Sequence, residues 1–197
     1  MKNFEETEVS RRTVLAGIVS FAAAAIGSLP VLAHAKPAAK KWDAAYELAI
    51  DYEIASQQGR RAHRPYIAIF VLDKAGNAIR TLTLQYNPPK GNRWLGDLRE
   101  WMRNERTRSQ KSGGNLADTV TSATRNAGKY SVVWDGKNDA GKLVDQGTYT
   151  VCVEAAREHG TYQLMRKEVT VANKPFKLIL EGNAEIAGAT IDYRKHK

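Results

Sequence analysis

The feature that most constrains this chain is a strict alternation of side-chain character over residues 42–54. Large apolar residues such as Tyr46, Leu48 and Ile50 stand at every second position, and acidic residues or alanines stand between them. A period of two is the side-chain spacing on one face of a β-strand, whereas a helix repeats every 3.6 residues. We therefore predict a long strand with one buried face.

Most of the remaining chain also predicts strands. Residues 65–72 are apolar without interruption, which suits a central strand covered on both faces. Turn residues at 73–77 then lead to a partner strand at 79–86. Further strands are expected at 130–134, 147–155, 162–171, 176–180 and 186–193. About eight strands with regular turns predict a mainly β fold, an immunoglobulin-like antiparallel β-sandwich.

One segment departs from this pattern and predicts a helical insertion between the two halves of the sandwich. Over residues 93–108, apolar side chains recur at intervals of three and four, which is the spacing of a helix face. We place this helix at about 93–105. The following stretch, 106–124, is rich in Ser, Thr, Gly and Asn and is expected to be a long surface connection.

Residues 1–35 have the order of an export signal: a polar leader, an apolar run and a small-residue exit. The adjacent Arg11 and Arg12 stand just before the apolar run, which resembles a twin-arginine signal. An ordinary secretory signal and a retained membrane anchor are the alternatives.

Cleavage of this signal is expected after Ala35, because residues 33–35 read Ala-His-Ala. It would leave one domain, residues 36–197, with no stable membrane anchor. We therefore expect a periplasmic protein exported by the twin-arginine pathway. Its formal net charge of +9 favours an anionic ligand or an envelope protein as partner, and export argues against nucleic acid.

Two resemblances add to this interpretation. The hairpin at 130–149, with Trp134-Asp135-Gly136 at its centre, resembles the immunoglobulin-like hairpin of the flagellar hook-capping protein. The whole domain more closely resembles the predicted periplasmic family called domain of unknown function 2271. The matching stretches are 64–70, 93–95 with Trp101, 122–125, 134–137 and 154–160.

The family resemblance implies an exported domain without an agreed activity. Members of the family are often found beside PepSY-type membrane proteins and flavin transferases, and this association hints at redox chemistry or iron handling in the envelope. Five residues of the matching stretches form the candidate ligand-binding set: Arg64, Trp94, Arg125, Glu158 and His159.

Glu158 and His159 are the most suggestive pair, because they follow a predicted strand and enter a tight turn, where ligand groups often lie. A carboxylate beside an imidazole suits metal binding or proton transfer. The alternative is a structural corner in which Arg157 pairs with a carboxylate and Gly160 makes the turn.

Other chemistry finds little support. The single cysteine, Cys152, excludes a disulfide framework within the chain and is expected to be a packed, inert thiol. The histidines are too far apart in sequence to predict a metal site. Lys137 stands where a calcium loop needs an oxygen ligand, so residues 135–141 predict a hairpin turn. We predict no catalytic residues and no cofactor.

The sequence thus favours a non-catalytic binding or accessory module of the cell envelope. The alternative is a metal, flavin or iron-handling redox accessory with its site near Glu158 and His159, and a hydrolytic enzyme comes last. The oligomeric state is left open.

Overall fold

The structure of the protein is a computed structural model that describes residues 39–57, 63–88, 90–114, 116–118 and 120–196. The predicted export signal, with Arg11, Arg12 and the cleavage site after Ala35, lies outside the described residues. Within those residues, no helix combines the length and the apolar character that crossing a membrane requires.

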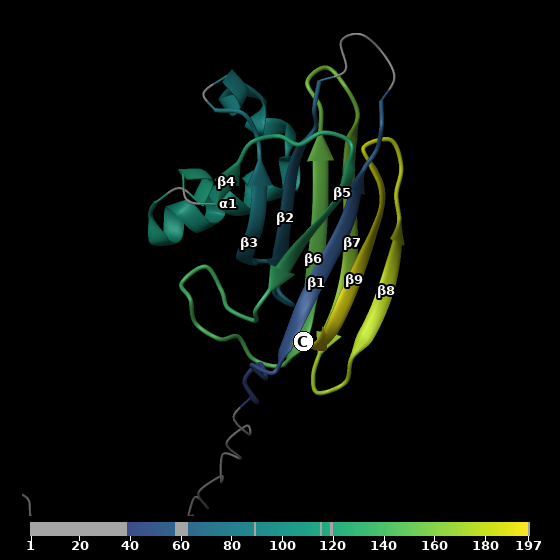
Figure 1. Cartoon of the computed structure of the whole chain (residues 1–197). Helices are drawn as coiled ribbons and strands as arrows, with labels where there is room; N and C mark the ends of the chain where they lie inside the picture. The colour runs from purple at the N-terminus through teal and green to yellow at the C-terminus, as the bar shows by residue number, and fades with distance from the viewer. Residues whose placement is uncertain (1–38, 58–62, 89, 115, 119, 197) are drawn as a thin grey trace, which may run out of the picture. The chain divides into compact units, whose positions relative to one another are not determined.

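Two β-sheets stacked face to face form the fold (Figure 1). One sheet has the order β5-β1-β9-β8 and the other β4-β3-β2-β6-β7; all pairs are antiparallel except β3 with β4. The predicted mainly β sandwich is therefore confirmed. The strands are β1 (Tyr46–Ile54), β2 (Tyr66–Leu72), β3 (Ala78–Gln85), β4 (Thr121–Ser122), β5 (Gly128–Trp134), β6 (Gly147–Ala156), β7 (Tyr162–Val171), β8 (Phe176–Glu181) and β9 (Ile186–Lys195).

The two sequence patterns read as strands have the burial they predict. In β1, Leu48, Ile50 and the other large apolar residues are buried between the sheets, while Asp51 on the opposite face is exposed. In β2 all seven residues are buried. Ile69 and its alternate neighbours face the core between the sheets, and Phe70 faces a second core on the outer side of the same sheet. The long alternation thus marks a strand with one buried and one solvent-facing side, and the uninterrupted apolar run marks a strand covered on both faces.

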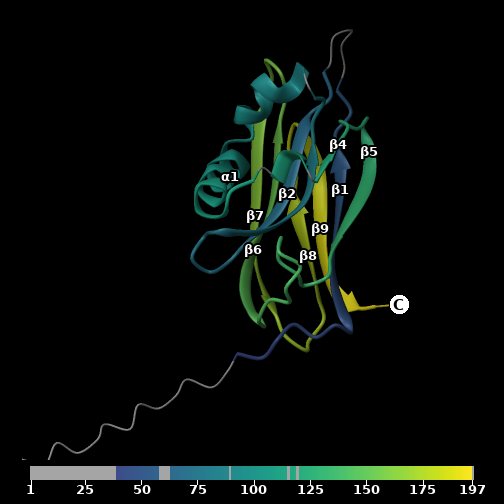
Figure 2. The same cartoon turned by 90° about the vertical axis from the view of Figure 1, so that its left-hand side faces the viewer.

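The helical insertion covers the outer face of the five-stranded sheet (Figure 2). The single helix predicted at about 93–105 is in fact two pieces, a 3₁₀ helix η1 (Lys90–Asp97) and an α-helix α1 (Arg99–Ser112). The break has a tertiary cause, because the carboxylate of Glu154 on β6 accepts hydrogen bonds from the first N–H groups of α1. Sequence spacing within the insertion carries no sign of that distant acceptor.

The connection after the helix is also more structured than predicted. It contains a short 3₁₀ helix η2 (Leu116–Asp118) and the two-residue strand β4, which pairs in parallel with β3. Ala117 is 3% exposed and belongs to the second core with Leu116 and Val120 packed beside it. The expectation of a surface connection is therefore wrong for this part, because its few apolar residues are enough to pack beneath the insertion.

Trp42 packs at one end of the space between the sheets. Its indole lies 4.8 Å from the ring of Trp134 and 5.3 Å from that of Tyr193, between ring centroids. Gly136 lies directly against the Trp42 ring: its φ is 73°, and a Cβ there would stand 2.2 Å from Trp42 Cγ. Only glycine fits this position, for both steric and backbone reasons.

Candidate functional site

The predicted site residues Glu158 and His159 lie in a tight turn between β6 and β7. The N–H of Gly160 donates to the carbonyl of Arg157 at 2.9 Å, and His159 has a φ of 53°, in the left-handed region that non-glycine residues rarely adopt. A Cβ at Gly160 would stand 2.8 Å from the Cβ of Arg157, so the turn requires glycine there. The turn thereby fixes the directions of two neighbouring polar side chains.

Arg157 is the structural anchor of this turn. Its Nη2 lies 2.6 Å from Glu185 Oε2, and its Nε lies 3.1 Å from both oxygens of that carboxylate. The Arg157 side chain is 11% exposed and that of Glu185 1% exposed. Arg157 also donates to the carbonyl of His63, and the Thr161 hydroxyl donates to Glu185. The ion-paired corner that the sequence offered as an alternative is therefore present at Arg157 and Gly160.

Glu158 is held by a phenol and an imidazole. The Tyr66 hydroxyl donates to Glu158 Oε1, and Glu158 Oε2 stands 3.7 Å from His63 Nδ1. Burial raises the pKa of Tyr66, and its hydrogen bond to the carboxylate raises it further, so the phenol keeps its proton. Sequence reasoning missed Tyr66 and His63 as partners of Glu158. The one signal in the sequence was the hydroxyl group of Tyr66, a hydrogen-bond donor near the start of an otherwise apolar stretch.

His159 contacts Trp94 of η1. The two ring centroids are 4.8 Å apart and the planes meet at 76°, and the Arg93 guanidinium carbon lies 5.0 Å from the Trp94 centroid. η1 reaches this position because Gly91 packs closely on the sheet, where a Cβ would stand 3.2 Å from the Tyr86 ring. The structure thus brings together two of the predicted residues that are 65 positions apart in sequence numbering, between η1 and the β6–β7 turn.

The indole N–H of Trp94 is the unusual feature of this site. The chain has four tryptophans, and Trp94 Nε1 is buried without an acceptor among the residues that the structure describes. A buried donor left unpaired costs about 1–3 kcal/mol. The other three indoles each have an acceptor: Trp42 donates to Tyr46 O at 3.0 Å, Trp101 to Thr81 Oγ1 at 3.2 Å and Trp134 to Lys137 O at 2.8 Å.

The two arginines of the predicted set lie differently. Arg64 is exposed and stands two residues before Tyr66 at the start of β2. Arg125 precedes β5, and its guanidinium carbon lies 4.8 Å from the ring centroid of Tyr130 in the four-stranded sheet. The contacts of the turn therefore join Trp94 with His159, and Arg125 packs on a different aromatic residue.

A second polar cluster surrounds Glu154, which sequence reasoning did not single out. Glu154 is fully buried; its oxygens accept from the N–H groups of Glu100 and Trp101, both at 2.8 Å, and from the Tyr162 hydroxyl at 2.9 Å. Burial raises the pKa of Glu154, against the lowering effect of these hydrogen bonds. The available signal was a lone carboxylate inside the apolar run of β6. Its role is to cap α1 and tie the insertion to the sheet.

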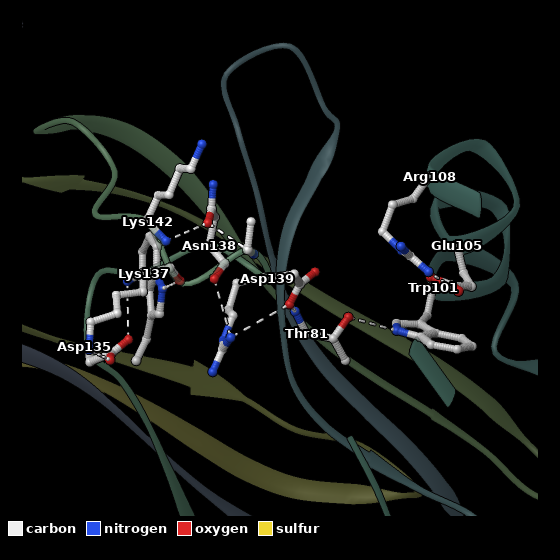
Figure 3. Close-up of polar contacts among 12 residues, drawn as sticks. Thr81, Trp101, Glu105, Arg108, Asp135, Lys137, Asn138, Asp139 and Lys142 are labelled. Carbon is white, nitrogen blue, oxygen red and sulfur yellow. Dashed lines mark hydrogen bonds and ion pairs between the residues drawn. The ribbon is translucent and has the colours of Figure 1, made fainter. Parts of the chain in front are cut away.

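The loop after β5 is closed by its own contacts, as Figure 3 shows. Lys137 Nζ lies 2.8 Å from Asp135 Oδ2, and Asn138 Oδ1 accepts from the N–H groups of Ala140 at 3.1 Å and Lys142 at 2.9 Å. Residues 135–141 thus form a turn, which an antiparallel bridge between Lys137 and Leu143 closes. The hairpin expected over 130–149 is wrong as a pair of strands, because β5 lies in the four-stranded sheet and β6 in the five-stranded sheet, so the chain crosses between the sheets here. Asp139 in the same loop accepts from the N–H of Thr81 at 3.1 Å and so fastens the loop to β3.

Cys152 has the environment expected of a packed thiol. It is 0% exposed, and burial raises its pKa to about 12, so the thiolate form is disfavoured. Among the described residues, no group of three or more His, Cys, Asp or Glu side chains could hold a metal ion.

A family model described as predicted periplasmic protein (DUF2271) matches residues 47–188, which include the turn, η1, the second core and most of the core between the sheets. The chain belongs to this family. Membership in DUF2271 confirms the resemblance stated from the sequence and assigns the chain to a family of predicted periplasmic proteins of unknown function. Neither a comparison with curated proteins nor one with solved structures found a match.

Proposed function

We propose that this DUF2271 protein is a non-catalytic binding module of the cell envelope, which takes an anionic group at Trp94 and His159. The single observation that carries the proposal is the buried, unpaired N–H of Trp94. A ligand oxygen that accepts this hydrogen bond would remove the cost of the unpaired donor, and that gain exists only in the bound state.

The charges around Trp94 favour an anion. The Arg93 guanidinium lies over the indole, and the His159 imidazole lies at its edge. The nearest described acid of the turn, Glu158, already has the Tyr66 hydroxyl and His63 as partners. The Arg93 guanidinium and the Trp94 N–H thus offer a positive charge and a free donor, which are the groups that bind phosphate or carboxylate.

The turn is also preorganised for binding. Arg157 and the buried Glu185 fix the backbone on both sides of Glu158 and His159. A contact made by a side chain that is already fixed loses less conformational entropy on binding than one made by a mobile loop.

The test is equilibrium binding of two simple anions, inorganic phosphate and citrate, followed by calorimetry and by tryptophan fluorescence. We expect saturable binding that Trp94→Phe abolishes, because phenylalanine keeps a ring but has no N–H, and that His159→Ala weakens. Arg125→Ala is the matched control, since it removes a cation that packs elsewhere, and it should bind normally. Unchanged binding by Trp94→Phe, or no binding of either anion, contradicts the proposal.

The same purified protein distinguishes anion binding from the alternative, a redox or metal-handling role. Protein purified from the periplasm is examined for stoichiometric metal and for a visible absorption spectrum. A metal or chromophore that disappears in His159→Ala favours the alternative and contradicts simple anion binding.

We further propose export by the twin-arginine pathway. The support is the Arg11-Arg12 pair before the apolar run, together with a family of predicted periplasmic proteins. Replacing both arginines by lysine conserves the charge but should leave the protein in the cytoplasmic fraction. Normal export of this variant, or of the unaltered chain in cells without the twin-arginine translocase, contradicts this route.

A further inference from the structure

The two sheets end side by side at β7 and β8, and these two edge strands differ in how they are protected. β7 pairs only with β6 and β8 only with β9 among the described strands. An edge strand offers unpaired N–H and C=O groups to any other strand, and proteins commonly block such edges with charged side chains.

β7 is blocked in this way. Met165, Lys167 and Val169 alternate along the face that meets the core, yet Lys167 is exposed while its two neighbours are buried. An inward-pointing lysine on an edge must reach solvent past the strand, so it obstructs an incoming strand. The adjacent Arg166 and Glu168 are exposed as well.

β8 has no comparable device. Its inward side chains are apolar, and its outward row is Lys177, Ile179 and Glu181. Ile179 is 79% exposed, far more than Val133 at 46% or Leu143 at 37%, the other exposed large hydrophobics of the described chain. A prominent apolar side chain at the centre of an open edge needs an explanation.

The space beside β8 is open. A groove of about 540 Å³ runs between β7 and β8 and is lined by residues of these strands together with Asn183. Figure 1 shows β8 as the outermost strand on its side of the sandwich. A strand from another chain therefore has access to this edge.

The sequence of β8 is complementary to itself in the antiparallel direction. If a two-fold axis passes beside Ile179, the two Ile179 side chains stand opposite each other, and Lys177 stands opposite Glu181 of the second copy, twice. On the inner face Leu178 then stands opposite Leu180 of the second copy. Directly opposed apolar pairs and opposite charges are the arrangements that stabilise antiparallel strands.

We infer that a second copy of this chain pairs with β8 through its own β8, which joins the two four-stranded sheets into one sheet across a two-fold axis. This surface is separate from the proposed anion site. A symmetric pairing of identical surfaces is the usual form of a homodimer interface.

Other registers and edges are less favourable. A shift of the axis by one residue places Lys177 opposite Ile179, or Ile179 opposite Glu181, and so exposes a charge to an apolar side chain. At the β5 edge, an axis beside Ser131 places Lys129 opposite Val133. The charge pattern therefore selects β8 and one register.

A cysteine placed on the axis tests this register directly. In the proposed dimer the two copies of residue 179 are about 4.5–5.5 Å apart between Cα atoms, within the range of a disulfide. We expect Ile179→Cys to form a cross-linked dimer rapidly under mild oxidation. Ser131→Cys is the matched control, since it is exposed on the outer face of the β5 edge, and the native Cys152 is buried.

Charge exchange tests the pairing without a cross-link. Sedimentation of the purified chain should show a monomer–dimer equilibrium. Lys177→Glu should raise the dimer dissociation constant about tenfold, because two attractive pairs become repulsive. Glu181→Lys should do the same, and the double exchange should restore dimerisation.

The inference is overturned by a chain that sediments as a monomer at all concentrations. It is also overturned if Ile179→Cys and Ser131→Cys cross-link at equal rates, or if the double exchange is as weak as either single variant. All of these side chains are exposed, so the folded state survives the substitutions.

Discussion

Glu154 and Glu158 stand four residues apart at the same end of β6, and the molecule uses them in opposite ways. Glu154 is fully buried, and both of its oxygens accept hydrogen bonds from the helix start and from Tyr162. Glu158 has a side chain that is 20% exposed and lies beside a tryptophan–histidine contact with an unpaired donor. A satisfied buried cluster stabilises the fold, whereas an incompletely satisfied one at the surface has binding capacity left.

The largest expected change in stability distinguishes the structural residue of the turn, Arg157, from the proposed binding residue, His159. Arg157→Ala leaves the Glu185 carboxylate buried without its cation, and should lower the free energy of unfolding by about 4 kcal/mol. Urea unfolding followed by circular dichroism measures it. His159→Gly in the same turn is the control and should be nearly neutral or stabilising, since glycine has no Cβ and adopts a φ of 53° without strain. Equal losses would show that the turn has no such division.

The next effect separates the two glutamates. Glu154→Ala leaves three donors without their acceptor and should cost about 3 kcal/mol of stability, with loss of helical signal from α1. Glu158→Ala should cost about 1 kcal/mol, because it leaves one donor, the Tyr66 hydroxyl, without its acceptor. The same unfolding measurement compares them, and a greater loss for Glu158→Ala would reverse our assignment.

Two indoles sharpen the comparison further. Trp101→Phe removes a hydrogen bond to Thr81 and should cost about 1 kcal/mol more than Trp94→Phe, which removes a donor that has no partner. Calorimetric unfolding without added anions measures both. If Trp94→Phe is the more destabilising variant, the Trp94 N–H has an acceptor in the unliganded protein, and the basis of the proposed function is removed.

The smallest effect is a pH dependence. Since burial raises the folded-state pKa of Glu154 above its ordinary value of 4.5, the folded state favours the protonated form. The contribution of protonated Glu154 to the free energy of unfolding is fully present below pH 4.5, and it is lost as pH rises through the raised pKa. The stability of the unaltered protein relative to Glu154→Gln should therefore increase as pH falls from neutral. A difference that is independent of pH would show that Glu154 titrates normally.

The strands could be predicted because their signals are local. Alternation in β1 and the apolar run of β2 depend only on neighbouring residues, and β7 has the predicted bounds, 162–171. The start of α1 could not be predicted in this way, because its capping group, Glu154, lies more than fifty residues further along the chain.

The candidate site was predicted in part for a similar reason. Glu158 and His159 stand out as a polar pair at a strand end, and the family resemblance added Trp94. Their partners Tyr66 and His63, and the unpaired state of one indole among four, depend on how η1 packs against the sheet. Arg125 shows the converse, since a motif match placed it in the set and its packing partner is Tyr130.

The glycine beneath Trp42 has a mechanical consequence. Because Gly136 lets the indole approach so closely, Trp42 packs against the rings of Trp134 and Tyr193 just ahead of β1. Its backbone N–H also donates to the Val144 carbonyl at 2.8 Å. A force that pulls the chain from its amino-terminal side therefore loads this contact before it can peel the first strand. The absence of a side chain at position 136 thus allows the contact that resists mechanical separation of β1 from the sandwich.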